Sequence, residues 1–282
     1  MDTFAFHIEL FPNQPWSEIA IAWLSEVGFD AFEETETGLI AYASETGIEN
    51  PENSKAEIEN WAKESDIQTN IEIVRIPQEN WNARWESDFH PVSVEDRLII
   101  VAPFHDKPKT GGLVVEIQPQ MSFGTGHHQT TWMMSKALLD LDFLPEKVLD
   151  MGTGTGILAI LAEKLGAKEI EAIDIEEWSA ENTRENVIRN GCSTITTYHG
   201  DIELIEGKKF GLILANINKN VLKSHLSRYK DSLVPGGVLM LSGFFETDVK
   251  ELMELARENG FQKQKEFNKE TWAALQLQLM EE

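Results

Sequence analysis

The sequence has few of the features that mark secreted or membrane proteins. Its 282 residues include a single cysteine, Cys192, so no disulfide can form within the chain. No apolar run reaches the roughly 20 residues that a membrane-spanning helix needs. The first ten residues lack the basic and long apolar segments of a signal peptide. We therefore expect a protein of the reducing cytoplasm that makes no contact with a membrane.

Basic residues are also scarce. The chain has 24 Lys and Arg against 48 Asp and Glu, a net charge of −24. Proteins that bind nucleic acid usually carry a basic surface, so we expect no direct nucleic-acid binding. Residues 1–80 hold 17 acidic and three basic side chains, a net charge of −14. Such a surface either only keeps the protein soluble or attracts a basic partner.

The first part of the chain has the pattern of a small α+β domain. The expected order is strand, helix, hairpin, helix and strand, at residues 3–10, 15–27, 29–44, 53–65 and 68–77. This β-α-β-β-α-β order is typical of a ferredoxin-like sandwich. We expect the domain to cover residues 1–78, with a linker at 79–96.

The remaining residues, 97–282, have an α/β pattern. Two strand-like segments, 97–104 and 111–119, are joined by a polar, glycine-rich turn. From residue 128 onward short apolar strands alternate with helices, which indicates a doubly wound, mostly parallel sheet covered on both faces. The last two strand-like segments, 261–267 and 272–280, have no helix between them, so we expect a terminal antiparallel hairpin.

A glycine-rich turn follows one of these strands in "VLDMGTGTGILAI", residues 148–160. Gly152, Gly154 and Gly156 let the backbone turn sharply and approach a ligand closely. In doubly wound sheets, ligands bind beyond the carboxyl ends of the strands. The G-x-G-x-x-G/A fingerprint of dinucleotide enzymes is met only formally. A turn without a ligand is the other alternative.

Polar residues end the following strands. Asp174 lies 22 residues after Gly152, where a carboxylate can accept hydrogen bonds from both hydroxyls of an adenosine ribose, or cap a helix. Asp201 follows the third strand, where it can meet an adenine amino group. Asn216 and Asn218 follow the very apolar fourth strand, "LILANIN", and are expected to face the ligand crevice.

The loop "MSFGTGHHQTT", residues 121–131, precedes the first of these helices. A metal site, a catalytic histidine and a ligand-binding loop are all compatible with its composition. His127 and His128 are adjacent, whereas two metal ligands on a helix need an i, i+4 spacing, so we expect no metal. His128 remains a candidate general base, and His127 is expected to be only a loop residue.

The series "LDMGTGTG", "IDI", "GD" and "LANIN" resembles the class I methyltransferases, which use S-adenosylmethionine. The loop "FGTGHHQTT", followed by "LDMGTGTGILAI" and "LANI", resembles one family in particular, the bacterial ribosomal protein L11 methyltransferases. The resemblance covers nearly the whole chain and is strongest over residues 121–216. It implies a Rossmann-like methyltransferase domain and an N-terminal ferredoxin-like domain that binds the protein substrate.

The resemblance also implies a cofactor site. It places contacts of S-adenosylmethionine at Thr131, Gly152, Asp174 and Asn216, and makes the loop at 121–131 a lid over the cofactor. The expected cofactor-binding residues are Phe123, Gly124, Thr125, Gly126, Thr131, Gly152, Gly154, Asp174, Asp201 and Asn216. Asn216 and His128 are the candidates for positioning the amine. Asn218 departs from the family pattern, in which a small or apolar residue is expected.

The function that the resemblance implies is protein-lysine N-methylation. A monomer would transfer methyl groups from S-adenosylmethionine to the N-terminal α-amine and lysine ε-amines of ribosomal protein L11, a basic protein held by the acidic N-terminal domain. Three other hypotheses stay open. The first is a methyltransferase whose acceptor is another protein, an RNA or a small molecule. The second is a binding protein that keeps the fold without catalysis, and the third is a nicotinamide oxidoreductase.

Overall fold

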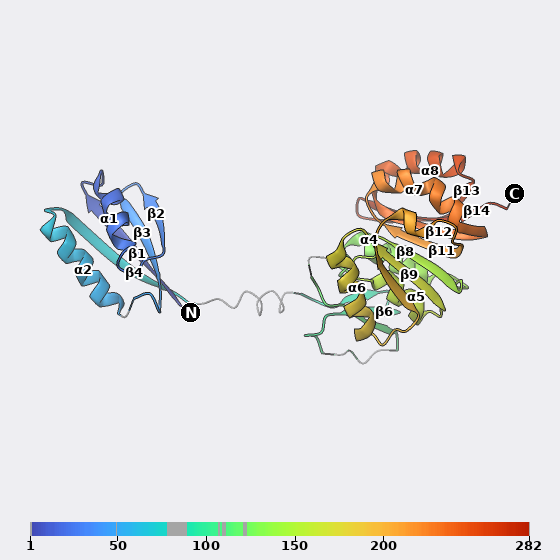
Figure 1. Ribbon diagram of the computed structural model, residues 1–282, viewed down its shortest axis with the longest axis horizontal. Helices are drawn as coiled ribbons and strands as arrows, with labels where there is room; N and C mark the ends of the chain where they lie inside the picture. The colour runs from blue at the N-terminus through green and yellow to red at the C-terminus, as the bar shows by residue number, and fades with distance from the viewer. Residues whose placement is uncertain are drawn as a thin grey trace. The chain divides into compact units, whose positions relative to one another are not determined.

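The computed structural model describes residues 2–48, 50–77, 89–106, 108, 111–120 and 123–281. The chain divides into two compact units, Met1–Asp88 and Phe89–Glu282, which we describe separately (Figure 1). Most of the predicted linker, residues 79–88, lies outside the described residues. Its remainder, 89–96, belongs to the second unit and contains the short strand β5 (Val92–Val94).

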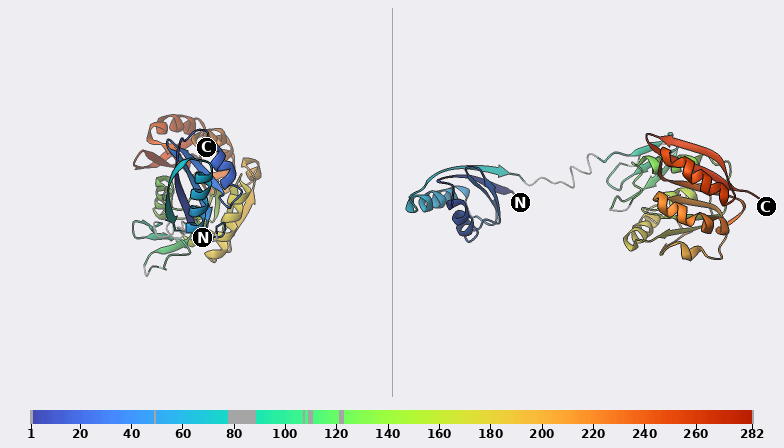
Figure 2. Two further views of the ribbon diagram at one scale, coloured as in Figure 1. Left: turned by 90° about the vertical axis from the view of Figure 1, so that its left-hand side faces the viewer. Right: turned by 90° about the horizontal axis from the view of Figure 1, so that it is seen from above.

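The first unit has four strands and two helices among its described residues. They are β1 (Thr3–Phe11), α1 (Trp16–Leu24), β2 (Ala31–Thr35), β3 (Gly38–Ser44), α2 (Pro51–Glu64) and β4 (Gln68–Ile76). The sheet order is β2-β3-β1-β4, and every pairing is antiparallel. Both helices lie on the same side of this sheet, as the right-hand view of Figure 2 shows.

Alternation along β1 separates the core of this unit from its open face. Phe6, Ile8 and Leu10 are buried and pack with residues of both helices. His7 points to the opposite face, and it lies in register with Glu72 of β4 on one side. On the other side it pairs with Ile40 of β3, which in turn pairs with Glu33 of β2. The open face therefore carries acidic side chains.

The second unit contains a seven-stranded sheet and a three-stranded one. Its further strands are β6 (Leu98–Val101), β7 (Leu113–Glu116), β8 (Lys147–Met151), β9 (Glu169–Asp174), β10 (Ile195–His199), β11 (Phe210–Asn216), β12 (Leu233–Phe245), β13 (Phe261–Lys269) and β14 (Trp272–Leu279). Its helices are α4 (Gln129–Leu139), α5 (Ile157–Lys164), α6 (Glu177–Arg189), α7 (Lys219–Ser232) and α8 (Val249–Glu258), with 3₁₀ turns η1 (Ile202–Ile205) and η2 (Glu246–Asp248).

The large sheet has the order β10-β9-β8-β11-β12-β14-β13. Strands β8 to β12 pair in parallel, whereas β14 is antiparallel to both β12 and β13. The predicted doubly wound α/β fold with a terminal antiparallel hairpin is confirmed. Order along the sheet reverses between β8 and β11, which is the point where such folds bind their ligands.

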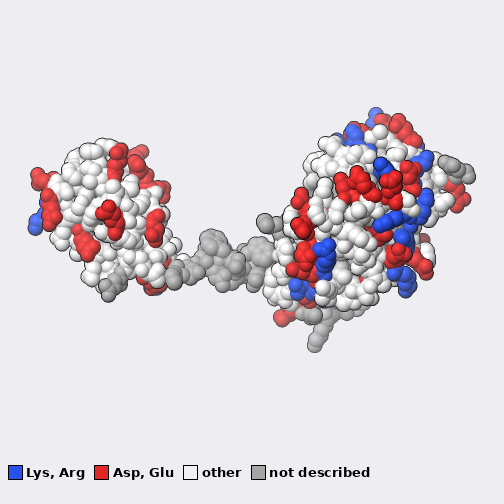
Figure 3. All heavy atoms as spheres, in the orientation of Figure 1, with Lys and Arg blue, Asp and Glu red and all other residues white. Residues whose placement is uncertain are grey.

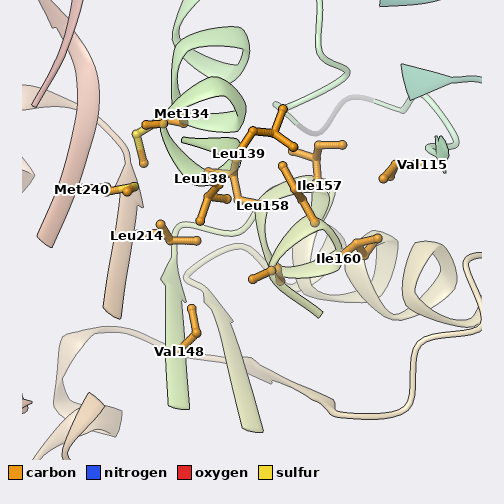
Figure 4. Packing of buried hydrophobic residues seen from close by; sticks show 14 of the residues in the cluster. Val115, Met134, Leu138, Leu139, Val148, Ile157, Leu158, Ile160, Leu214 and Met240 are labelled. Atoms are coloured by element: carbon orange, nitrogen blue, oxygen red, sulfur yellow. The ribbon is translucent and has the colours of Figure 1, made fainter. Parts of the chain in front are cut away.

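Both faces of this sheet are buried, as a parallel sheet requires. Val148 of β8 packs into the core between the sheet and helices α4 and α5, and Figure 4 shows it there beneath Leu138 and Leu158. The next residue, Leu149, belongs to the core on the opposite face, where α7 and α8 pack. The continuous apolar runs of these strands follow from this burial on two sides.

Strands β6 and β7 lie within the predicted segments 97–104 and 111–119, but they do not pair as two strands joined by a tight turn would. Strands β6 and β7 pair in parallel, with Leu98 opposite Leu113, and β5 adds to β6 in the antiparallel sense. A parallel pair needs a connection that returns to the start of the first strand.

Candidate active site

A cavity of about 500 Å³ opens at the carboxyl ends of β8, β9 and β11. Six of the predicted site residues line it, namely Phe123, Gly152, Gly154, Asp174, Asp201 and Asn216. They come from five different segments of the chain, which the strand order brings to one edge of the sheet. The predicted ligand crevice and the cavity thus coincide at these positions.

The glycine-rich turn forms the floor of the cavity. Gly152 and Gly154 have φ angles of +74° and +59°, which L-residues with side chains rarely adopt. A Cβ atom on Gly152 would lie 2.1 Å from Cγ2 of Ile217, and one on Gly154 would lie 2.2 Å from the carbonyl oxygen of Phe123. Only glycine fits at these two positions, because Ile217 and the backbone of Phe123 occupy the space that a Cβ atom would need.

Asp174 ties this turn to the start of α6. Its Oδ2 accepts a hydrogen bond from the backbone N–H of Gly154 at 2.8 Å, and its Oδ1 accepts one from the N–H of Glu176 at 3.0 Å. Each carboxylate oxygen has a further lone pair for a donor from the cavity. The two roles considered for Asp174, capping and binding of hydroxyl groups, are therefore compatible.

Asp150 stabilises the glycine-rich turn through hydrogen bonds. Its carboxylate is almost completely buried and accepts hydrogen bonds from the Thr153 hydroxyl at 2.8 Å and the Ala159 N–H at 3.2 Å. Burial raises the pKa of Asp150 to about 7, and the two hydrogen bonds oppose that rise. Asp150 therefore shapes the turn without itself lining the cavity.

Asn216 presents an unsatisfied polar atom at the end of β11. Its Oδ1 is buried and has no hydrogen-bond partner among the residues that the structure describes, although the residue lines the cavity. A buried acceptor without a partner is costly unless a ligand supplies the donor. The nearby Asn218 also lines the cavity and caps α7, because its Oδ1 accepts from the N–H of Asn220 at 2.9 Å. This cap gives a physical reason for an asparagine there.

His128 caps α4. Its Nδ1 accepts a hydrogen bond from the N–H of Thr130 at 3.3 Å and lies 2.8 Å from the Thr130 hydroxyl oxygen. Burial lowers the pKa of His128, which favours the neutral ring. Since Nδ1 acts as an acceptor, the neutral ring carries its hydrogen on Nε2. That nitrogen is then a donor, so this geometry offers no free base.

Aromatic rings form a continuous row beside the cavity, and two of them, Phe123 and Trp272, line it. The ring of His128 lies 4.9 Å from Phe123 and 4.6 Å from Trp272, and Trp272 lies 4.3 Å from Phe245. Phe123 and Phe245 are about half exposed, so their faces are open to solvent. Aromatic faces of this kind attract cations such as an alkylammonium group.

Four predicted residues of the loop do not reach the cavity wall, and Met121 and Ser122 lie outside the described residues. Gly124 holds the loop on the glycine turn, because its carbonyl oxygen accepts from the Thr155 hydroxyl at 2.7 Å. Gly126 packs closely against Ile100.

Thr125 and Thr131, the other two loop residues, have separate positions. The Thr125 hydroxyl oxygen lies 3.4 Å from Nδ1 of His127. Thr131 is fully buried in the first turn of α4, and its hydroxyl has no partner within the described part of the chain. Thr131 therefore keeps a free hydroxyl at the end of the predicted lid.

Several residues of the cavity wall were missed by the sequence analysis. They include Ile175, Trp178, Val221, His225, Gly243 and Trp272. Ile175 follows the predicted site residue Asp174 directly. Val221 and His225 lie four apart on the helix after "LANIN", so a helical repeat pointed to these two residues. Trp272 reaches the site only because β14 inserts beside β12, which no local pattern reveals.

Among the described residues, no group of three or more His, Cys, Asp or Glu side chains is arranged to hold a metal ion. Within the same residues, no helix has the length and apolar character needed to cross a membrane.

Comparisons with known proteins agree with this geometry. The family described as "Ribosomal protein L11 methyltransferase (PrmA)" matches residues 24–280. A protein of that name from Porphyromonas gingivalis is 40% identical over 96% of this chain and 95% of its own length. One from Bacteroides fragilis is 36% identical over 99% of this chain and 100% of its own.

A solved structure supports the same relationship. The crystal structure of a ribosomal protein L11 methylase from Lactobacillus delbrueckii subsp. bulgaricus is 29% identical, with a TM-score of 0.64. It covers 68% of this chain and 100% of that one. The chain therefore belongs to the ribosomal protein L11 methyltransferase family.

Proposed function

We propose that this chain transfers methyl groups from S-adenosylmethionine to the N-terminal α-amine and lysine ε-amines of ribosomal protein L11. Family membership over nearly the whole length supports the chemistry and the substrate. The observation that carries the proposal is the unpartnered Asn216 Oδ1, buried in the wall of a cavity whose mouth is aromatic. It offers one acceptor for an amine hydrogen in an apolar opening.

The cavity fits this cofactor. The backbone of Gly152 and Gly154 lines it without side chains, and Asp174 keeps lone pairs for hydroxyl groups. Ile175 and Val221 provide apolar surface for a flat heterocycle. We propose that the predicted cofactor-binding residues on the wall make direct contact. Gly124, Thr125 and Gly126 would hold the lid in place, and the unpartnered hydroxyl of Thr131 would contact the cofactor.

The chain has to present a neutral amine to an already activated methyl group. S-adenosylmethionine supplies that group on a positively charged sulfur. Asn216 can accept a hydrogen bond from the amine and so orient the lone pair of the amine nitrogen. Asn216 would therefore contribute to catalysis by positioning the amine. Burial of the amine inside the cavity, away from water, disfavours the charged form of lysine and so lowers its pKa.

We propose that no side chain acts as a general base. His128 was the candidate, but its Nδ1 is engaged in the cap of α4. The proton of an incoming ammonium group would pass to water at the open mouth before transfer. The row from Phe123 to Phe245 would then stabilise the methylated, positively charged product through cation–π contacts.

We propose that residues 1–78 form a ferredoxin-like domain that binds L11, joined by a linker at 79–96 to the methyltransferase domain at 97–282. The β-α-β-β-α-β order and the sheet order β2-β3-β1-β4 support this fold. The charged side chains on its visible face are almost all acidic, which suits a basic partner (Figure 3). A monomeric state belongs to the same proposal, and so does the cytoplasmic location that the single cysteine favours.

The test is a comparison of acceptors. The full chain is incubated with S-adenosylmethionine and, in separate reactions, with purified L11, other basic ribosomal proteins, ribosomal RNA or free lysine. Formation of S-adenosylhomocysteine is measured. We expect turnover with L11 and background rates with the other acceptors. Equal rates with L11 and with another protein, or turnover with RNA or free lysine alone, would refute the proposed substrate.

A further inference from the structure

One end of the cavity carries two polar side chains next to each other. Asp201 precedes η1 and His225 lies on α7, and both line the cavity. Nε2 of His225 lies 3.8 Å from Oδ1 of Asp201. That oxygen accepts a hydrogen bond from the N–H of Ile202 at 2.7 Å. The other oxygen, Oδ2, accepts none from the described residues, so it is the acceptor open to a ligand.

The orientation of the His225 ring follows from its second neighbour. Nδ1 of His225 lies 3.3 Å from the hydroxyl oxygen of Tyr229, which is fully buried. Burial and the charge of Asp201 raise the pKa of Tyr229, so its hydroxyl stays protonated and can donate to Nδ1. The hydrogen of a neutral His225 then resides on Nε2, toward Asp201. The cavity wall thus has a donor beside an acceptor.

His225 is neutral in these surroundings. Only a small part of its side chain is exposed, and burial lowers its pKa, although the charges of Asp201 and Glu203 oppose this shift. Burying an imidazole costs more than burying a leucine of similar size, unless the ring nitrogens find partners. Tyr229 satisfies Nδ1, and Nε2 is left to face the cavity and Asp201.

We propose that His225 is a specificity-determining residue, which together with Asp201 selects the 6-aminopurine ring of the cofactor. Adenine carries an amino donor next to a ring-nitrogen acceptor, which complements the Asp201 acceptor and the His225 donor. Hypoxanthine carries an oxygen acceptor in place of the amino donor and an N–H donor in place of the ring-nitrogen acceptor, so it matches neither side chain. The N–H of Ile202 is already engaged by Asp201, so His225 supplies the donor. This inference rests on the proposed use of S-adenosylmethionine.

The test measures discrimination rather than activity. Calorimetry gives the dissociation constants of the full chain for S-adenosylhomocysteine and for S-inosylhomocysteine. We expect the wild type to prefer the adenine compound by about 100-fold or more, as sites built for hydrogen bonds do. His225→Leu lowers this ratio by about 10-fold, the effect of one lost hydrogen bond. His225→Gln, which keeps a donor, retains most of it.

Two further variants separate base recognition from packing. Val221→Ala, one turn earlier on the same helix, weakens the binding of both compounds equally and leaves the ratio of their dissociation constants unchanged. Tyr229→Phe removes the partner that orients His225 and lowers the ratio, which provides the test if His225→Leu does not fold. An unchanged ratio in His225→Leu, or in Tyr229→Phe in its place, overturns the inference. A wild type that binds neither compound would instead refute the proposed function.

Discussion

Asp150 and Asp174 lie at the ends of neighbouring strands and differ in what surrounds their carboxylates. Asp150 is buried beneath the glycine turn and accepts hydrogen bonds from Thr153 and Ala159. Asp174 lies on the cavity wall and accepts from two backbone N–H groups. The first residue therefore affects stability, and the second affects binding.

Asp150 should give the folded chain a distinct pH dependence. Its pKa is about 7 in the folded state against 3.8 as the ordinary value, so the folded chain binds more protons between these limits. The stability that this residue contributes is therefore highest below the lower value, falls as the pH rises toward 7, and is level above it. Between about pH 5 and about pH 8, the wild type should lose free energy of unfolding relative to Asp150→Asn. Urea titrations at both pH values measure this difference, and a constant difference would contradict the assigned burial effect.

Asp174 should control the affinity for the cofactor. In Asp174→Asn the amide nitrogen must face the N–H of either Gly154 or Glu176, both of which are donors. We expect binding of S-adenosylhomocysteine to weaken by about 10-fold or more, because a charge-assisted hydrogen bond is lost and donors are opposed. Calorimetry measures the change. The neighbouring exposed variant Glu176→Gln serves as the control, and equal losses in both variants would argue against the assignment.

At the scale of elements, the loop before α4 is connected to the start of the second unit. The segment 89–94 is held by side-chain donors at three carbonyl oxygens. Nε2 of His105 donates to Phe89, Nε2 of His127 donates to His90 at 2.8 Å, and Nε1 of Trp132 donates to Ser93 at 3.0 Å. His127 and Trp132 flank the predicted cofactor contact Thr131, so the loop and this segment are ordered together.

Removal of one of these donors should loosen the segment. His127→Leu leaves the carbonyl of His90 without this hydrogen bond, which is worth about 1 kcal/mol. We expect the amides of residues 92–94 to exchange with deuterium about fivefold faster than in the wild type, a change that matches this energy. Mass spectrometry of peptic fragments measures the exchange. His7→Leu, in the first unit, should leave these amides unchanged, and the same result for His127→Leu would show that the contact does not order the segment.

The elements differ in how well the sequence predicts them. The strands and helices of the second unit can be recognised from the local sequence pattern. The glycine turn and Asp174 lie at the ends of strands, and in this fold the ends of the strands form the ligand site. The direction in which β6 and β7 pair, and the insertion of β14 beside β12, depend on contacts far apart in sequence. Trp272 could therefore not be predicted as a site residue, whereas the i, i+4 repeat at His225 was present in the sequence and overlooked.

At the scale of the molecule, negative charge is concentrated in the first unit. Residues 1–80 carry a net charge of −14, more than half of the total of −24. Glu33 and Glu72 lie on the open face of the sheet, and Glu9 lies on the same face two residues after His7. A basic protein approaching this face is attracted over about one Debye length, roughly 8 Å at physiological salt.

Neutralising this face should weaken the enzyme only toward its protein substrate. In the triple variant Glu9→Gln, Glu33→Gln and Glu72→Gln, we expect KM for L11 to rise about three- to tenfold at low salt, with kcat and the affinity for S-adenosylhomocysteine unchanged. Steady-state kinetics at several salt concentrations measure the effect.

The control removes the same number of charges elsewhere. Asp231, Glu254 and Glu258 are exposed on the second unit, and the variant with Asn or Gln at these positions should keep the KM of the wild type. An equal rise of KM in both triple variants would show that net charge, and not this face, attracts the substrate.

The most direct test of the proposed methylation is the intact mass of L11 after incubation with the full chain and S-adenosylmethionine. We expect a series of products separated by one methyl group each, which extends beyond the number that a single amine can accept. Asp174→Asn should give the same series far more slowly. A single addition would contradict repeated methylation of several amines, and no addition, despite measurable binding of S-adenosylhomocysteine, would contradict L11 as the substrate.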